Sequence, residues 1–130
     1  MKISSNTGLR LVDAASEPSR NSNLVNYALR GLSQCWLPEY GRWSHIYHID
    51  GRQLPNESLP HSDVFYTLNV LLGISRVREI PDDIAVSDIF RRNSIQLTTL
   101  PVAKYAYGMA LWAAAELELD LPSPVASAWT

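Results

Sequence analysis

Apolar side chains recur along most of the chain at three- and four-residue intervals, the spacing of amphipathic helices. Prolines and aspartates separate these stretches and mark where one helix stops and the next begins. Ser62 has the side chain of a helix N-cap, and Asp63 follows it in the first turn, where the helix dipole favours a carboxylate. The pattern predicts four helices, over residues 23–37, 62–77, 84–97 and 101–120.

The two ends of the chain lack this helical pattern. Residues 1–22 are polar apart from a short apolar island at 9–12, which predicts a flexible lead or a loosely docked arm. Residues 122–130 follow the fourth helix without a stop signal of their own, which predicts a tail and a chain truncated within a longer helical protein. The helical-hairpin domain is therefore expected to span residues 23–121.

The connection between the first two helices differs in character from the rest of the chain. Residues 43–49 are aromatic and β-branched, and they run into Asp50-Gly51, a tight-turn dipeptide. This combination predicts a short β-hairpin. Long loops inside compact domains are often functional, so residues 38–60 are where we expect a site.

Three tyrosines suggest internal repetition. Tyr27, Tyr66 and Tyr105 are separated by the same 39 residues. Repeats of helical pairs have periods of about 33 to 47 residues. Such pairs stack on their neighbours because a single pair cannot bury both of its faces. The expected fold class is all-α, with helical hairpins arranged as an open array and one long loop that contains the β-hairpin.

Composition supports one core and excludes several partners. The chain has 130 residues, of which 46% are hydrophobic, enough for a single domain. Its 11 basic and 13 acidic side chains give no basic field, so nucleic acid is not an expected partner. No apolar stretch approaches the roughly 20 residues that cross a bilayer, so no membrane association is expected.

The N-terminus and the cysteine content indicate the compartment. The first residues lack the continuous apolar segment of a signal peptide, which predicts a cytoplasmic protein. Cys35 is the single cysteine, so the chain cannot form an internal disulfide. Its position on a helical pattern is typical of an unreactive core thiol.

Three carboxylates lie in or beside the long loop, at Asp50, Glu57 and Asp63. A carboxylate pair about 5 Å or about 7 to 9 Å apart is what glycoside hydrolysis requires, but a spacing in sequence does not establish that distance. Each could instead have an ordinary structural role. Asp50 would be a turn residue, Glu57 a solvated loop acid, and Asp63 a partner of the helix dipole.

All three histidines fall in the same region, at His45, His48 and His61. With Asp63 they could supply nitrogen and oxygen ligands to a metal. On a strand, however, His45 and His48 would point to opposite faces, and no ligand pair has a recognised metal spacing. The sequence therefore predicts neither a metal site nor a cofactor, and a metal-assisted hydrolase ranks last among the alternatives.

Aromatic rings and arginines of the loop form a second constellation. Their rings could make a floor for a sugar ring, and their guanidinium groups could hold an acid group. The alternative is that these side chains pack the loop onto the helices. The expected ligand-binding residues are Trp43, Tyr47, Arg42, Arg52, Glu57 and Tyr66.

Two stretches carry a family resemblance. Residues 35–43, with Cys35-Trp36-Leu37-Pro38-Glu39 and Gly41-Arg42-Trp43, and residues 62–73, Ser-Asp-Val-Phe-Tyr-Thr-Leu-Asn-Val-Leu-Leu-Gly, resemble the opening hairpins of α/α-toroid proteins. These include the six-hairpin glycosidases and the terpenoid-cyclase-like toroids. The resemblance covers residues 24–119 as a helical pattern. It implies a ring of paired helices with loops gathered at one mouth, near which Asp63 would lie.

Two functions from different classes follow. Four helices cannot close such a ring, so the first is the N-terminal part of a toroid that binds or processes a carbohydrate-like polar small molecule. Its candidate catalytic residues are Asp63 and His61, and whether the protein is an enzyme stays open. The second is a non-enzymatic helical module that associates with a protein partner or with itself. Its surface would be the alanine-rich fourth helix and the tail that ends near Trp129.

Overall fold

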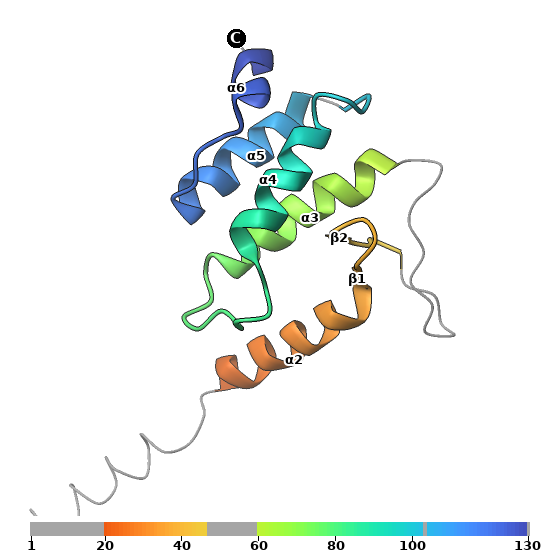
Figure 1. Ribbon diagram of the computed structural model, residues 1–130. Helices are drawn as coiled ribbons and strands as arrows, with labels where there is room; N and C mark the ends of the chain where they lie inside the picture. The colour runs from red at the N-terminus through yellow and green to blue at the C-terminus, as the bar shows by residue number, and fades with distance from the viewer. Residues whose placement is uncertain (1–19, 47–59, 103, 130) are drawn as a thin grey trace, which may run out of the picture. The chain divides into compact units, whose positions relative to one another are not determined.

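The computed structural model describes residues 20–46, 60–102 and 104–129 (Figure 1). The chain divides into two compact units, Met1–Gly31 and Leu32–Thr130. The mainly helical class predicted from the sequence is confirmed. In the described residues the elements are α2 (Arg20–Cys35), β1 (Trp36–Leu37), β2 (Arg42–Trp43), α3 (Pro60–Ile74), α4 (Val86–Gln96), α5 (Lys104–Leu117) and α6 (Ser123–Trp129).

Helix α2 supplies the described part of the first unit, residues 20–31. Along this stretch Leu24 and Tyr27 are exposed. The helix ends at Cys35, before the proline that was expected to stop it. The reason is steric, because a proline disfavours helical geometry in the residue before it and Leu37 is already extended.

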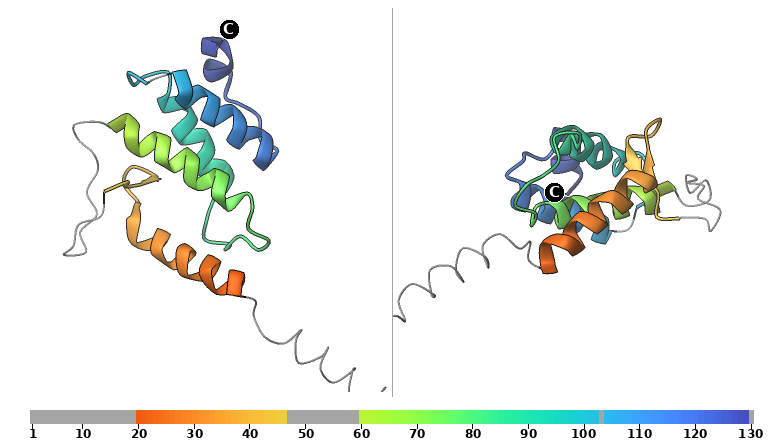
Figure 2. Two further views of the ribbon diagram at one scale, coloured as in Figure 1. Left: turned by 180° about the vertical axis from the view of Figure 1, so that it is seen from behind. Right: turned by 90° about the horizontal axis from the view of Figure 1, so that it is seen from below.

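The second unit has α3 at its centre, packed against α4, α5 and β2 (Figures 1 and 2). Helices α3 and α5 run parallel. Phe65 near the start of α3 contacts Tyr105 near the start of α5, and Arg76 just after α3 pairs with Glu116 near the end of α5. Helix α4 packs on α3 and also contacts α6. Parallel neighbours joined through an intervening helix are what a chain of helical hairpins produces.

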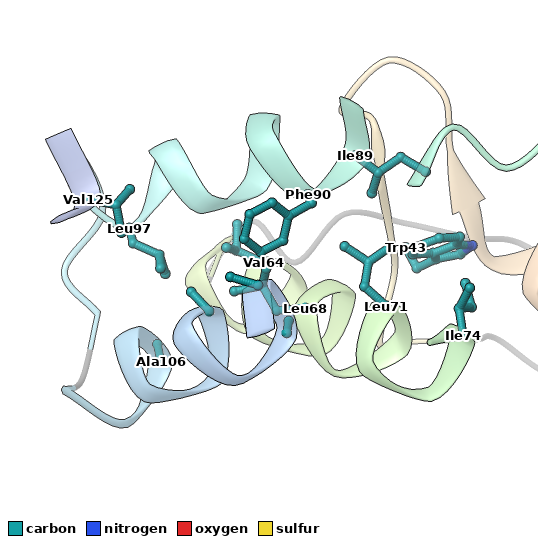
Figure 3. Close-up of a cluster of buried hydrophobic side chains, with 13 residues drawn as sticks. Trp43, Val64, Leu68, Leu71, Ile74, Ile89, Phe90, Leu97, Ala106 and Val125 are labelled. Carbon is teal, nitrogen blue, oxygen red and sulfur yellow. The ribbon is translucent and has the colours of Figure 1, made fainter. Parts of the chain in front are cut away.

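The core of the second unit lies where α3, α4 and α5 meet (Figure 3). Helix α4 contributes Phe90, which is 1% exposed, and α3 contributes Leu68 and Leu71. Cys35 packs against this core, and burial raises the pKa of its thiol, so the thiol stays protonated at neutral pH. Cys35 is thus partly buried at the edge of the core, and the unreactive thiol expected from the sequence stays a prediction.

Helix α5 enters the core through small side chains. Ala106, Ala110, Ala113 and Ala114 are all buried, and they allow the α5 backbone to approach its neighbours closely. This stripe was expected to dock a partner. That expectation is corrected, because the stripe is used inside the unit and is not available on its surface.

Ala110→Leu is therefore expected to destabilise the fold. Ala110 is fully buried, so three additional carbon atoms must displace neighbouring side chains or backbone. We expect the free energy of unfolding to fall by about 2 kcal/mol, measured by chemical denaturation. Ala115→Leu, at an exposed position of the same helix, is the matched control and should change stability little. Unchanged stability in Ala110→Leu would contradict this packing.

The short sheet lies earlier in the chain than expected. Strands β1 and β2 pair antiparallel, with Trp36 opposite Trp43 and Leu37 opposite Arg42. Gly41 closes the turn with a φ of 62°, a left-handed conformation that favours glycine, and its N–H donates to the Leu37 carbonyl at 2.9 Å. Trp43 is thus in the second strand instead of the first. The Asp50-Gly51 turn lies outside the described residues.

The C-terminal segment contains a helix that the sequence pattern missed. Residues 122–130 were expected to form a tail, yet α6 occupies most of them, and Val125 is buried in the core. Ser123-Pro124 is a helix-start signal, since proline is favoured in the first turn. The side chain of Trp129 lies outside the described residues. None of the helices described is long and apolar enough to span a membrane.

Candidate functional site

Asp63 is the buried charge around which the candidate site is built. It lies in the first turn of α3, where the exposed N–H groups and the helix dipole stabilise a carboxylate. Its side chain is 0% exposed. A carboxylate with so little water around it must be compensated by hydrogen bonds from the protein.

His45 supplies two of those hydrogen bonds. Its backbone N–H donates to Asp63 Oδ1 at 3.1 Å, and its ring Nδ1 lies 2.5 Å from the same oxygen. Because an ionised carboxylate only accepts, the ring proton is assigned to Nδ1. Asp63 thus fixes both the backbone and the ring of His45, whose side chain is 20% exposed.

Thr67, one helical turn after Asp63 in α3, bonds the backbone of Trp43 in the same segment, residues 43–45. Its Oγ1 accepts from the Trp43 backbone N–H at 3.0 Å and lies 3.4 Å from the Trp43 carbonyl, to which its hydroxyl donates. Residues four apart on a helix are about 6 Å apart along the axis. Residues two apart on an extended chain are about 6.6 Å apart and point their N–H groups the same way. The spacing of Asp63 and Thr67 along α3 therefore matches the spacing of their partners, His45 and Trp43, along the extended segment.

A row of aromatic rings leads away from this junction. The rings of His45 and Tyr66 are stacked with centroids 5.0 Å apart and only 5° between their planes. Tyr66 meets Phe65 edge to face at 5.6 Å, and Phe65 meets Tyr105 at 5.1 Å. We call these four residues the ring strip. It joins the segment after β2 to the first half of α3 and the start of α5, and Tyr66 is 45% exposed within it.

Two of the predicted ligand-binding residues are buried. Trp43 is 4% exposed, contacts Trp36 edge to face, and lies in the core near Leu71 and Ile74 (Figure 3). This burial supports the alternative that Trp43 packs the loop onto the helices, and its contact with a ligand stays a prediction. Arg42 is 9% exposed, with its guanidinium over the Tyr40 ring.

The other predicted site residues have different outcomes. His61 is half-buried at the start of α3, and its Nδ1 is buried with no hydrogen-bond partner among the described residues, whereas the ring bonded to Asp63 is that of His45. Its catalytic role stays a prediction. Tyr47, Arg52 and Glu57 lie outside the described residues, as does Asp50. Within the part of the chain that is described, no group of three histidine, cysteine or acidic side chains could hold a metal.

The contacts of the candidate site that sequence reasoning missed are Asp63 with His45 and Thr67 with Trp43. One local signal pointed to them. Asp63 and Thr67 are polar residues four apart in a helix whose neighbouring positions Val64 and Leu68 are fully buried. Buried polar side chains at that spacing imply a polar partner in the fold, although the identity of the partner is not readable from the helix.

The site combines a rigid histidine ring with an exposed tyrosine ring. A carboxylate that orients an imidazole is the arrangement used for general acid–base chemistry, and exposed aromatic rings are common in sites for ring-shaped ligands. The arrangement can therefore position a polar ligand against Tyr66. Comparison with known proteins adds no assignment, since no protein family, curated protein or solved structure matches the chain.

Proposed function

We propose that the chain forms the N-terminal hairpins of an α/α-toroid-like protein and binds a carbohydrate-like polar small molecule on the ring strip. The observation that supports this most is the Tyr66 ring, which is 45% exposed and stacked on a histidine that a buried carboxylate fixes. The stack covers one face of the tyrosine ring. The exposed area then offers the other face and the hydroxyl to a ligand.

Preorganisation makes such a surface effective. Asp63 and Thr67 anchor the backbone on both sides of Ser44, so the histidine ring under Tyr66 cannot swing away without breaking buried hydrogen bonds. A ring held in place loses little conformational entropy when a ligand stacks on it. The apolar face of a sugar packs against the ring, while its hydroxyl groups bond with the tyrosine hydroxyl and nearby polar groups.

The parallel course of α3 and α5 supports the toroid part of the proposal. Tyr105 lies near the start of α5 and Tyr66 lies in the first half of α3, so the ring strip crosses from one helix of the parallel pair to the other. Loops and helix starts gathered at one end form the mouth in the arrangement that the resemblance implies. In this proposal Asp63 positions His45, and the tyrosine rings contact the ligand.

Tyr66→Ala is expected to weaken ligand binding at least about tenfold, because it removes the central exposed ring of the strip. Binding would be measured by calorimetry of the full chain with cellotetraose, maltotetraose, chitotetraose and tetragalacturonate. Stability should fall by only about 1 kcal/mol, the size of the lost ring stack. Tyr27→Ala, which removes a tyrosine of α2 that is more exposed than Tyr66, is the control and should bind as the parent does.

Equal affinity in the Tyr66→Ala and Tyr27→Ala proteins would place binding elsewhere on the chain. If the parent binds none of the four oligosaccharides, the carbohydrate proposal is rejected, although the fold and the contacts of Asp63 would stand.

A second candidate function, association with a protein partner, is favoured by the outer side of α5. Tyr105 is 64% and Trp112 is 54% exposed. The Trp112 indole N–H donates to Glu116 at 3.2 Å, and Glu116 pairs with Arg76 at 2.6 Å, so the exposed ring has a fixed orientation. Aromatic side chains held in this way are enriched in protein interfaces. A Trp112→Ala variant that loses self-association in light scattering, while Tyr66→Ala keeps it, would favour this function.

A further inference from the structure

A second charged feature lies at the turn of the β-hairpin, formed by residues 38–41. Asn93 of α4 fixes this turn, since its amide donates to the Gly41 carbonyl at 2.9 Å and to the Ile89 carbonyl at 2.8 Å. Arg42 follows the turn in β2. Successive strand residues point to opposite faces, so the Arg42 side chain leaves the hairpin on the face opposite to Trp43, which is in the core.

Arg42 is a buried cation without a counter-charge in the described structure. Its side chain is 9% exposed, and its Nε is buried without a hydrogen-bond partner among the residues described. None of the ion pairs formed by described residues includes it. Its guanidinium lies over the Tyr40 ring, 5.2 Å from the ring centroid. Burying a charge in this way is costly unless a partner compensates it.

A second guanidinium lies at the adjacent residue. The Arg92 side chain of α4 passes over Gly41 so closely that a Cβ built there would be 2.8 Å from its Nη1 and 3.1 Å from its Cζ. Arg92 is half exposed and has only a long contact of 3.9 Å with Asp88. Two guanidinium groups thus lie against consecutive residues of one turn, Tyr40 and Gly41, and the missing side chain of the glycine makes room for that of Arg92.

The acids of these elements compensate the pair only in part. The turn contains Glu39, which is exposed, and α4 contains Asp88, which bonds Arg91 at 3.1 Å and lies 3.9 Å from Arg92. A guanidinium that lies over an aromatic ring uses its face for that contact. Its N–H donors point outward in the plane of the group, where they can bond an acceptor. Two such groups match the double charge and several oxygens of a phosphate better than the single charge of a carboxylate.

We propose that Arg42 and Arg92 form a binding site for a phosphate group at the turn of the β-hairpin. Arg42 supplies the buried, oriented donor and Arg92 the second charge, while Asn93 holds the turn against α4. This site contains no residue of the ring strip, so a test of phosphate binding is independent of a test of carbohydrate binding.

The test is titration of the full chain with sodium phosphate at constant ionic strength, followed by NMR of the arginine Nε–H signals. Sodium acetate and sodium chloride are the comparison salts. We expect saturable shifts of the Arg42 and Arg92 signals with phosphate alone. Arg92→Gln should weaken phosphate binding about tenfold, since it removes one of two charge-assisted contacts. Arg91→Gln is the matched control, because Arg91 is an exposed neighbour on the same helix and should not change binding.

Three results would overturn the proposal. They are the absence of a saturable shift, an equal response to acetate, and an Arg92→Gln protein that binds phosphate as the parent does. Because Arg92 is half exposed, its variant should keep the helical circular dichroism of the parent. An Arg42→Lys variant that retains the fold should also lose most of its phosphate affinity, as a lysine lacks the planar fork.

Discussion

Replacing Asp63 by alanine is expected to lower the free energy of unfolding by about 4 kcal/mol, the sum of two partly buried hydrogen bonds to a charged acceptor. Asp63 accepts from both the backbone and the ring of His45. Without it these donors lose their partner, and the segment after β2 loses one of its two anchors on α3. Chemical denaturation followed by circular dichroism measures the loss.

The control for this change is Asp88→Ala. Asp88 is also in the first turn of its helix, but it is half exposed and pairs with surface arginines. Its removal should reduce stability by less than about 1 kcal/mol. If the two variants were equally stable, Asp63 would not anchor the hairpin and His45 would not be fixed under Tyr66.

Phe90→Ala is expected to reduce the free energy of unfolding by about 4 kcal/mol. Phe90 is 1% exposed and is the largest fully buried side chain in the described residues. Its removal leaves a cavity between α4 and α3 that the packed helices cannot fill by relaxation alone. The same denaturation experiment measures this effect.

Leu24→Ala is the control for the Phe90 variant. Leu24 is a large apolar residue on α2 with 65% of its surface exposed. Its truncation should change stability by about 0.5 kcal/mol or less. Similar losses in both variants would mean that the core is not centred on α3, α4 and α5.

The helices could be read from the sequence because each carries a repeated apolar pattern with a clear boundary. The four predicted helices correspond to α2, α3, α4 and α5, with ends that differ by a few residues. Helix α6 was missed because seven residues are too few to display a period. The burial of the alanine stripe was also not predicted, because a row of small side chains has the same sequence pattern whether it packs in the core or against a partner protein.

The candidate site could be predicted only in part. Asp63 and Tyr66 were recognised, because a carboxylate in a first turn and an aromatic residue beside a polar loop are local features. The bond between Asp63 and His45 joins residues 18 apart in sequence, and the one between Trp43 and Thr67 joins residues 24 apart. Such pairings depend on how the loop folds back on the helix, and neither partner alone indicates them.

The sheet formed by residues 36–43 was not predicted, and this explains why Trp43 was assigned to other surroundings. Asp50-Gly51 is a strong turn signal, whereas the turn of the described sheet is made by Gly41 in a segment that starts with a proline. The hairpin therefore brings Trp43 to α3 by way of β2. A shift of the turn along the chain changes which side chains face the core, because alternate strand residues face opposite sides.

The measurement that tests the central claim most directly is an NMR titration of the full chain with the four oligosaccharides, observing the aromatic signals of tyrosine and histidine. Binding on the ring strip predicts saturable shifts of Tyr66, with smaller shifts of His45 and Tyr105, and no shift of the Tyr27 signals. Absence of saturable shifts with every sugar, or shifts confined to residues outside the ring strip, would contradict the proposed function.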